Sequence, residues 1–158
     1  MDLRWEILTP YAPLFVTGAW MTVKLTLIAL SLGLLLGLGI GLVNARPATG
    51  LRRVLRWILL GYVGFLRGTP LFVQILLVHF ALMPTLVHPE HGLLLSGAAA
   101  LEFRQSHGAF FSGALALTLN ASAYISEIVR AGIHSIARGQ VQAAESLGLD
   151  EYQTMRFI

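Results

Sequence analysis

An uncharged apolar run from Leu25 to Val43 is the feature that most restricts how this chain can fold. As a helix, a run of this length can cross roughly 30 Å of hydrocarbon. We place the whole span at residues 14–43, with Lys24 either extending its amine toward the interface or facing protein. The sequence therefore predicts a membrane-spanning helix near the N-terminus.

The composition agrees with lipid as the solvent. The chain is 56% hydrophobic and only 12% charged, with a mean hydropathy of +0.72. A soluble domain of 158 residues could not bury that share of apolar side chains. Cysteine is absent, which excludes disulfides and thiolate metal sites. We expect an all-α, polytopic membrane helical bundle with about three transmembrane helices.

Small residues recur at every fourth position of the first span. Such a ladder is a packing surface for a second membrane helix, and it comprises Ala29, Gly33, Gly37, Gly41 and Ala45. The alternative is that glycine stands at these sites only because membrane helices tolerate it. The regular spacing favours Gly33, Gly37 and Gly41 as helix-packing positions.

Residues 44–56 carry four arginines and no acid: Arg46, Arg52, Arg53 and Arg56. A basic cluster beside a membrane span ordinarily marks the cytoplasmic side. This position also argues against a nucleic-acid partner, despite the net charge of +3. Apolar residues at helical spacing opposite the arginines predict an interfacial helix that leads into the next span.

The second predicted span, residues 57–83, is interrupted by Arg67-Gly68-Thr69-Pro70. Thr69 suits a helix N-cap and Pro70 a first helical position, so we expect the helix to break and restart there. A charged break in a membrane helix is tolerated only against protein or a water-filled cavity, which makes Arg67, Thr69 and Pro70 candidates for a translocation path. The alternative places Arg67 at the cytoplasmic headgroups, with Gly-Thr-Pro a plain helix start.

Residues 84–108 form a turn-rich connection to the third span. His88-Pro89-Glu90-His91 has the residue types of metal ligands. It lacks the spacing of zinc-hydrolase motifs, however, and Pro89 disfavours a helical presentation of the two imidazoles. We therefore predict no metal site.

The third predicted span, residues 109–129, has one polar face. Asn120, Tyr124 and Glu127 follow helical spacing on that face. A carboxylate in a membrane helix is a functional hypothesis by default, so these three residues are further candidates for the translocation path. The alternative is that Glu127 only pairs with Arg130 at the cytoplasmic end of the helix.

A short helix is expected between Gly139 and Gly148, where Ala143 and Ala144 give it a small-residue face. Asp150 precedes Gln153 by three residues, which predicts a capping box and a second helix from about Glu151. A small-residue face suits a helix that lies in a partner's groove. An ordinary loop helix is the main alternative, and a DNA-binding helix-turn-helix is a remote one.

The sequence around this helix resembles the permease subunit of bacterial ABC importers, specifically the polar amino acid uptake family of the histidine/glutamine type. That family carries a cytoplasmic Glu-Ala-Ala loop with a glycine four residues after the second alanine. Gln142 replaces the usual Glu here, and Ala137 stands where proline is common. The matching stretches are residues 18–27 (GAWMTVKLTL), 65–74 (FLRGTPLFVQ) and 120–148.

The resemblance implies a type I ABC importer permease-like bundle that imports polar amino acids by alternating access. Its implied partners are a cytoplasmic ABC ATPase subunit, an extracytoplasmic amino-acid-binding protein, a second permease subunit and membrane lipid. The ATPase-coupling loop, about 132–158, would contain Gly139, Gln142, Ala143, Ala144 and Gly148. No cofactor is implied. The sequence also lacks a Gly-x-x-x-x-Gly-Lys-Ser/Thr phosphate loop, so ATP hydrolysis is expected from the partner.

The arginines also predict the topology in the bacterial inner membrane. With residues 46–56 inside, the N-terminus and residues 84–108 lie outside and residues 132–158 are cytoplasmic. The family has two more spans after the coupling loop, so we expect this chain to be a fragment or a truncated product. A small membrane scaffold without transport activity is the alternative function, and an intramembrane enzyme is a more remote one.

Overall fold

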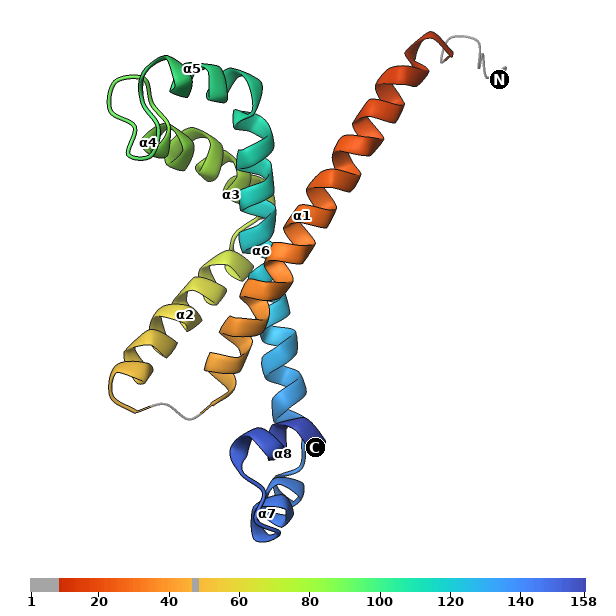
Figure 1. Ribbon diagram of the computed structural model, residues 1–158, viewed down its shortest axis with the longest axis vertical. Coiled ribbons are helices and arrows are strands. Elements are labelled where there is room, and N and C mark those ends of the chain that lie inside the picture. The colour runs from red at the N-terminus through yellow and green to blue at the C-terminus, as the bar shows by residue number, and fades with distance from the viewer. Residues whose placement is uncertain (1–8, 47–48) are drawn as a thin grey trace.

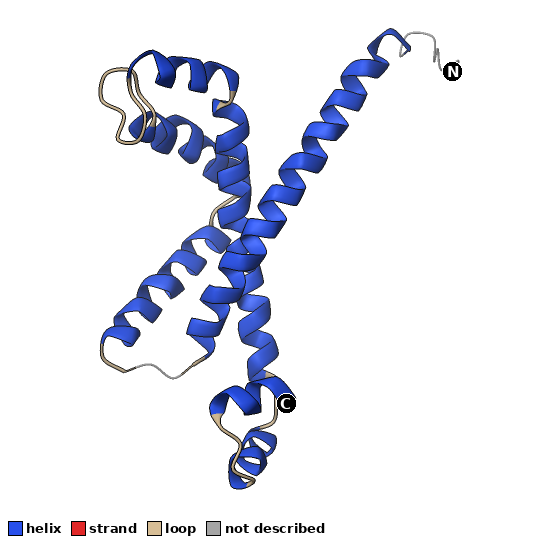
Figure 2. Ribbon diagram, viewed as in Figure 1, coloured by secondary structure: helices blue, strands red, loops and turns tan. Residues whose placement is uncertain are grey.

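The computed structural model describes residues 9–46 and 49–158, and in these ranges it contains helices and no strand (Figures 1 and 2). Residues 1–8 and 47–48 lie outside the described part, as do the expectations made for them. The elements in chain order are η2 (Thr9–Tyr11), α1 (Ala12–Ala45), α2 (Leu51–Gly68), α3 (Leu71–Leu77), the π-helical turn η3 (Val78–Leu82), α4 (Met83–Leu86), α5 (Gly97–Ser106), α6 (Gly108–His134), α7 (Arg138–Ser146) and α8 (Glu151–Phe157).

Two of these elements are long and apolar enough to cross a membrane, Thr9–Ala45 and Gly108–His134. The bent pair α2 and α3–α4 gives a third span if it is counted as one. The first helix covers residues 14–43, where we placed the first span, and extends two residues beyond them at each end. In contrast, α6 continues five residues beyond residue 129, and α2 begins at Leu51 as one helix that includes the expected interfacial segment.

The helices α1 and α6 cross one another and form the main contact of the fold (Figure 1). A β-carbon built on Gly33 would lie 2.8 Å from that of Ala121, and one on Gly41 would lie 2.7 Å from that of Val129. The two backbones therefore approach as closely as glycine allows. Because the contacting residue numbers rise together on both helices, α1 and α6 run in the same direction.

Two parallel spans require the chain between them to return across the membrane, and α2 to α4 make that return (Figure 1). The predicted break is present: α2 ends at Gly68, α3 begins at Leu71, and the two axes differ by 112°. The expectation that Thr69 caps α3 is wrong. Its hydroxyl instead donates a hydrogen bond back to the Phe65 carbonyl at 2.9 Å, as threonine often does inside helices.

The connection between α4 and α6 contains one more helix than the turn-rich sequence indicated. Ala100 of α5 is fully buried against Met83 and Val87, with Phe103 packed beside them. These contacts fold α5 back onto the end of α4 near the start of α6 (Figure 1). Within the same connection, the rings of His88 and His91 stack with centroids 3.7 Å apart.

Beyond α6 the chain ends in two short helices with well-defined termini. The predicted capping box is present, since the Asp150 carboxylate accepts from the Gln153 amide while the Gln153 side chain accepts from the Asp150 amide. Gly148 has φ +82° and closes α7 in a Schellman turn, with Leu149 donating to the Ala144 carbonyl. The expected bracket by Gly139 is wrong, because α7 begins at Arg138 after an extended Ala137.

Candidate functional site

The break between α2 and α3 is held by the side chain of Gln74, which is 4% exposed. Its amide nitrogen donates to the Leu66 carbonyl at 2.6 Å and to the carbonyl and hydroxyl of Thr69 at 3.0 and 2.9 Å. In a continuous helix, the Leu66 carbonyl would accept from residue 70. Pro70 has no N–H, so Gln74 supplies the missing donor.

The same side chain connects the break to α6. The Gln74 carbonyl oxygen accepts from the Asn120 amide nitrogen at 3.1 Å. Asn120 thus faces the break, and a polar connection runs from α2 through α3 to α6. We call Gln74, Thr69 and Asn120 the break network.

Three charged side chains lie on the α2 and α6 sides of the break network. Glu127 accepts two hydrogen bonds from Arg130, at 2.8 and 3.1 Å, and lies 3.3 Å from Arg67. The exposed fractions of the side chains are 44% for Arg67, 21% for Glu127 and 36% for Arg130. This ion-pair group therefore combines two cations with one anion and is open to solvent or solute on one side.

Two of the predicted path residues make weaker contacts. Tyr124 contacts the group through its ring, whose centroid lies 5.6 Å from the Arg67 guanidinium carbon. Pro70 is exposed and acts through its missing N–H. The structure thus gathers Arg67, Thr69, Asn120, Tyr124 and Glu127 around one bend.

Sequence reasoning missed a second hydrogen-bonded contact between α2 and α6. The Tyr62 hydroxyl lies 3.1 Å from the Leu119 carbonyl and 2.7 Å from the hydroxyl of the fully buried Ser122. Gln74 was missed as well. An isolated glutamine in the apolar run LFVQILL, four residues after a proline, was the available signal for it. Nothing local marks Tyr62, because its partners belong to a helix far along the chain.

The predicted coupling residues fall on both sides of α7. Gly139, Gln142 and Ala143 are exposed, whereas Ala144 is buried, and both alanines line a surface pocket with Leu149 and Phe157 of α8. Gly148 serves the turn described above. In the part of the chain that the structure describes, the exposed side of α7 is therefore accessible to a partner molecule.

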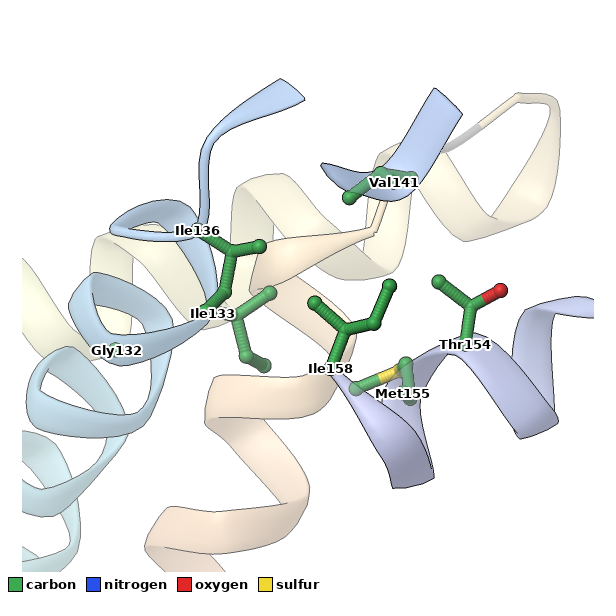
Figure 3. Close-up of a pocket in the computed structure, with 7 residues that line it drawn as sticks. All are labelled: Gly132, Ile133, Ile136, Val141, Thr154, Met155 and Ile158. Atoms are coloured by element: carbon green, nitrogen blue, oxygen red, sulfur yellow. The ribbon is translucent and has the colours of Figure 1, made fainter. Parts of the chain in front are cut away.

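An apolar cavity of about 240 Å³ separates the end of α6 from α8 (Figure 3). Ile133 and Ile136 face Met155 and Ile158 across it (Figure 3). The sulfur of Met155, which lines this cavity, also lies 3.4 Å from the Arg46 guanidinium at the end of α1. The end of α1, the end of α6 and α8 therefore lie at the same end of the molecule, which is also the end where α2 begins (Figure 1).

These features describe a helical membrane protein with a tightly packed pair of spans and a broken third one. The family model for binding-protein-dependent transport system inner membrane components matches residues 33–158. The chain belongs to this family and is an inner membrane protein.

Among known proteins, the chain is similar to permease proteins of amino acid transport systems. The chain is 33% identical to the arginine transport system permease protein ArtQ of Bacillus subtilis (strain 168), covering 99% of this chain and 62% of that protein. It is 31% identical to the putative glutamine transport system permease protein GlnP of Rickettsia prowazekii (strain Madrid E), covering 90% of this chain and 56% of that protein.

A solved structure, the crystal structure of an amino acid ABC transporter with histidines, matches with a TM-score of 0.71 and 34% identity over 99% of this chain and 63% of that one. The resemblance to amino acid permeases and the all-α membrane fold are thereby confirmed. The chain spans between 56% and 63% of the length of these relatives.

Proposed function

We propose that this chain is the membrane-spanning subunit of an ATP-driven importer of polar amino acids. The observation that carries the proposal is the bend between α2 and α3, where the buried Gln74 amide contacts Asn120 of α6 and an ion-pair group connects α2 to α6. The names of the relatives, which refer to arginine and glutamine transport, support polar amino acids as the substrate class.

The break network and the ion-pair group form part of the translocation path in this proposal. Non-helical backbone is tolerated at membrane depth where it is buried in protein or lines a water-filled cavity. Gln74 satisfies the backbone at the bend, and Arg67, whose side chain is 44% exposed, is the charged group of the bend that a polar solute can reach beside Glu127. Tyr124, Thr69 and Pro70 complete this lining.

The exposed side of α7 couples the path to ATP hydrolysis in a separate cytoplasmic ATPase subunit. Gly139, Gln142 and Ala143 form the contact, and Ala144 and Gly148 fix the helix beneath it. The sequence contains no phosphate-binding loop that would let this chain hydrolyse ATP itself. An extracytoplasmic amino-acid-binding protein delivers the solute, and a second permease subunit completes the path.

The orientation follows from the basic side chains near the ends of the spans. Seven arginines belong to the end that carries α7 and α8: Arg46, Arg52, Arg53, Arg56, Arg130, Arg138 and Arg156. By the positive-inside bias that end is cytoplasmic, including residues 132–158, and the N-terminus lies outside.

Uptake of labelled amino acids by vesicles containing the complete transporter tests the proposal. We expect uptake that requires ATP and the binding protein, and we expect Glu127→Gln to reduce it at least tenfold. Glu102→Gln, which removes an exposed carboxylate on α5, is the matched control and should leave uptake unchanged. If vesicles that contain the complete transporter, ATP and the binding protein take up no amino acid, the result would instead favour a membrane scaffold.

A further inference from the structure

The π-helical turn η3 contains a histidine whose ring is anchored at one nitrogen. The Nδ1 atom of His79 lies 3.0 Å from the hydroxyl of Ser112 on α6, a side chain that is 1% exposed. The Ser112 hydroxyl has one proton, which it donates to the Gly108 carbonyl at 2.7 Å. Nδ1 must therefore be the donor to Ser112, and in the neutral ring Nε2 is then an acceptor. Such π-helical turns are frequent at functional sites.

A cavity of about 380 Å³ lies beside this ring, between η3 and α5. Its volume is within the range of about 300–1,000 Å³ that is usual for small-molecule sites. The residues that line it include His79, Phe80, Met83, Leu101, Arg104 and Gln105. Within residues 9–46 and 49–158, the exposed side chains of Arg104 and Gln105 have no hydrogen-bond or ion-pair partner.

The polar groups of the cavity identify the kind of ligand. Arg104 supplies a guanidinium, which pairs well with a carboxylate, and no Asp or Glu is among the described residues that line the cavity. The His79 Nε2 supplies an acceptor, which suits an ammonium group. A simple anion would use only the guanidinium. A zwitterionic amino acid would use both groups, and its carbon atoms would lie against the apolar lining.

The cavity lies on the same arm of the chain as the bend. His79 follows Gln74 of the break network by five residues, and α5 folds back over the end of this arm (Figure 1). In the orientation proposed above, this end of the molecule is extracytoplasmic. The cavity is therefore on the side from which the solute arrives.

We propose that this cavity is an outer binding site for a zwitterionic amino acid. Arg104 binds the α-carboxylate, the His79 Nε2 accepts a hydrogen bond from the α-ammonium, and the Gln105 amide adds a polar contact. The inference rests on the proposed function, because it takes the solute to be an amino acid. Since all amino acids share these two charged groups, the site holds the solute before it reaches the bend and leaves discrimination between side chains to the rest of the path.

Solid-state NMR of the complete transporter tests the site. The complex is labelled with ¹⁵N-histidine and placed in phosphatidylcholine vesicles without ATP or the binding protein, and His79→Asn identifies the His79 signals by their absence. We expect L-glutamine to shift the His79 Nε2 signal. N-acetyl-L-glutamine, which lacks the ammonium group, should require at least a tenfold higher concentration, because it loses a charge-assisted hydrogen bond.

Arg104→Gln tests the carboxylate contact and should raise the L-glutamine concentration for half of the shift at least tenfold. Its matched control is Lys24→Gln, which removes an exposed cation from α1 and should behave as the wild type. Equal concentrations for Arg104→Gln and the wild type would overturn the site. If Arg104→Gln does not assemble, the comparison of the two glutamine compounds on the wild-type complex still decides the question.

Other outcomes would assign the cavity to a different ligand. A shift by sodium acetate at the same concentration as L-glutamine would contradict a site for a zwitterion. A shift caused by phosphatidylethanolamine vesicles that L-glutamine does not reverse would assign the cavity to a lipid headgroup.

Uptake by the same complex separates this inference from the proposed function. ATP-dependent uptake without any shift by L-glutamine or L-arginine would overturn the outer site and leave the proposed function in place. A shift by L-glutamine without uptake of any amino acid would support the site and contradict the proposed function.

Discussion

The helix α6 packs against α1 on one side and against α2 and α3 on the other, and the two contacts differ in character. The first stabilises the fold, whereas we propose that the second belongs to the translocation path. Toward α1, the helix α6 presents Ala121, Ile125 and Val129, which lie directly against Gly33, Gly37 and Gly41 of α1, and we call this close contact the seam. Toward α2 and α3 it presents amides, hydroxyls and a carboxylate. The first contact depends on shape, and the second on hydrogen bonds that another arrangement of the bend could exchange.

The largest effect is expected in the seam. A β-carbon on Gly37 would lie 2.7 Å from the Ile125 β-carbon and 2.8 Å from the Ser122 carbonyl oxygen, which is backbone and cannot rotate away. Gly37→Val should therefore separate α1 from α6 and destabilise the complex by about 3 kcal/mol, the upper part of the range for overpacking. A thermal melt of the purified complex measures this.

Gly39 provides the matched control for this substitution. It lies on the same helix, and a β-carbon there would meet nothing within 4 Å. Gly39→Val should melt within a degree or two of the wild type. Equal destabilisation by both substitutions would mean that the helix itself, rather than the seam, is sensitive to valine.

A smaller loss is expected from the bend. Gln74→Leu keeps the volume but leaves the Leu66 carbonyl without a donor and Asn120 without an acceptor. Each unsatisfied buried group costs about 1–3 kcal/mol, and partial access to water at Thr69 reduces the sum, so we expect about 2 kcal/mol. Gln105→Leu on the exposed side of α5 is the control, and hydrogen exchange should locate the loosening at residues 66–74. Exchange that rises uniformly along α2 would contradict this assignment.

The third effect concerns one hydroxyl. Tyr62→Phe removes the group that lies 2.7 Å from the Ser122 hydroxyl, and the net value of such a bond is about 1 kcal/mol. Tyr124→Phe is the matched control, because that ring contacts Arg67 by its face and is 47% exposed. A melt that distinguishes the two phenylalanine variants supports a structural hydroxyl at Tyr62. Identical melting temperatures would mean that the Tyr62 hydroxyl does not stabilise the contact between α2 and α6.

The seam was readable from the sequence because it depends on periodicity alone. Glycine at every fourth residue predicts a close helix contact, although it does not name α6 as the partner. The break was readable for a similar reason, since Pro70 removes a donor wherever it stands in a helix. Asp150 and Gln153 likewise specify a helix start through local hydrogen bonds.

The remainder of the candidate site depends on contacts between distant residues. Gln74 meets Asn120 because the bend directs α3 toward α6, and no local pattern encodes a 112° angle. Thr69 was assigned to a cap because its type fits one, yet the tertiary arrangement directs its hydroxyl back to Phe65. Spacing placed Asn120, Tyr124 and Glu127 on one face, and only the fold places Arg67 opposite them.

The smallest effect on stability is expected from the charge that we assign to transport. Arg67→Gln removes one of the two cations at Glu127 while Arg130 keeps both of its hydrogen bonds to the carboxylate. Because the Arg67 side chain is 44% exposed, its ion pair should contribute less than about 1 kcal/mol, within the usual range for solvent-accessible pairs. Lys24→Gln serves as the charge-matched control, and both variants should melt close to the wild type while only Arg67→Gln lowers amino acid uptake. A loss of stability near that of Gly37→Val would mean that the Arg67 ion pair is structural. The contact of α6 with α2 and α3 would then stabilise the fold as the α1–α6 seam does, which contradicts the comparison drawn above.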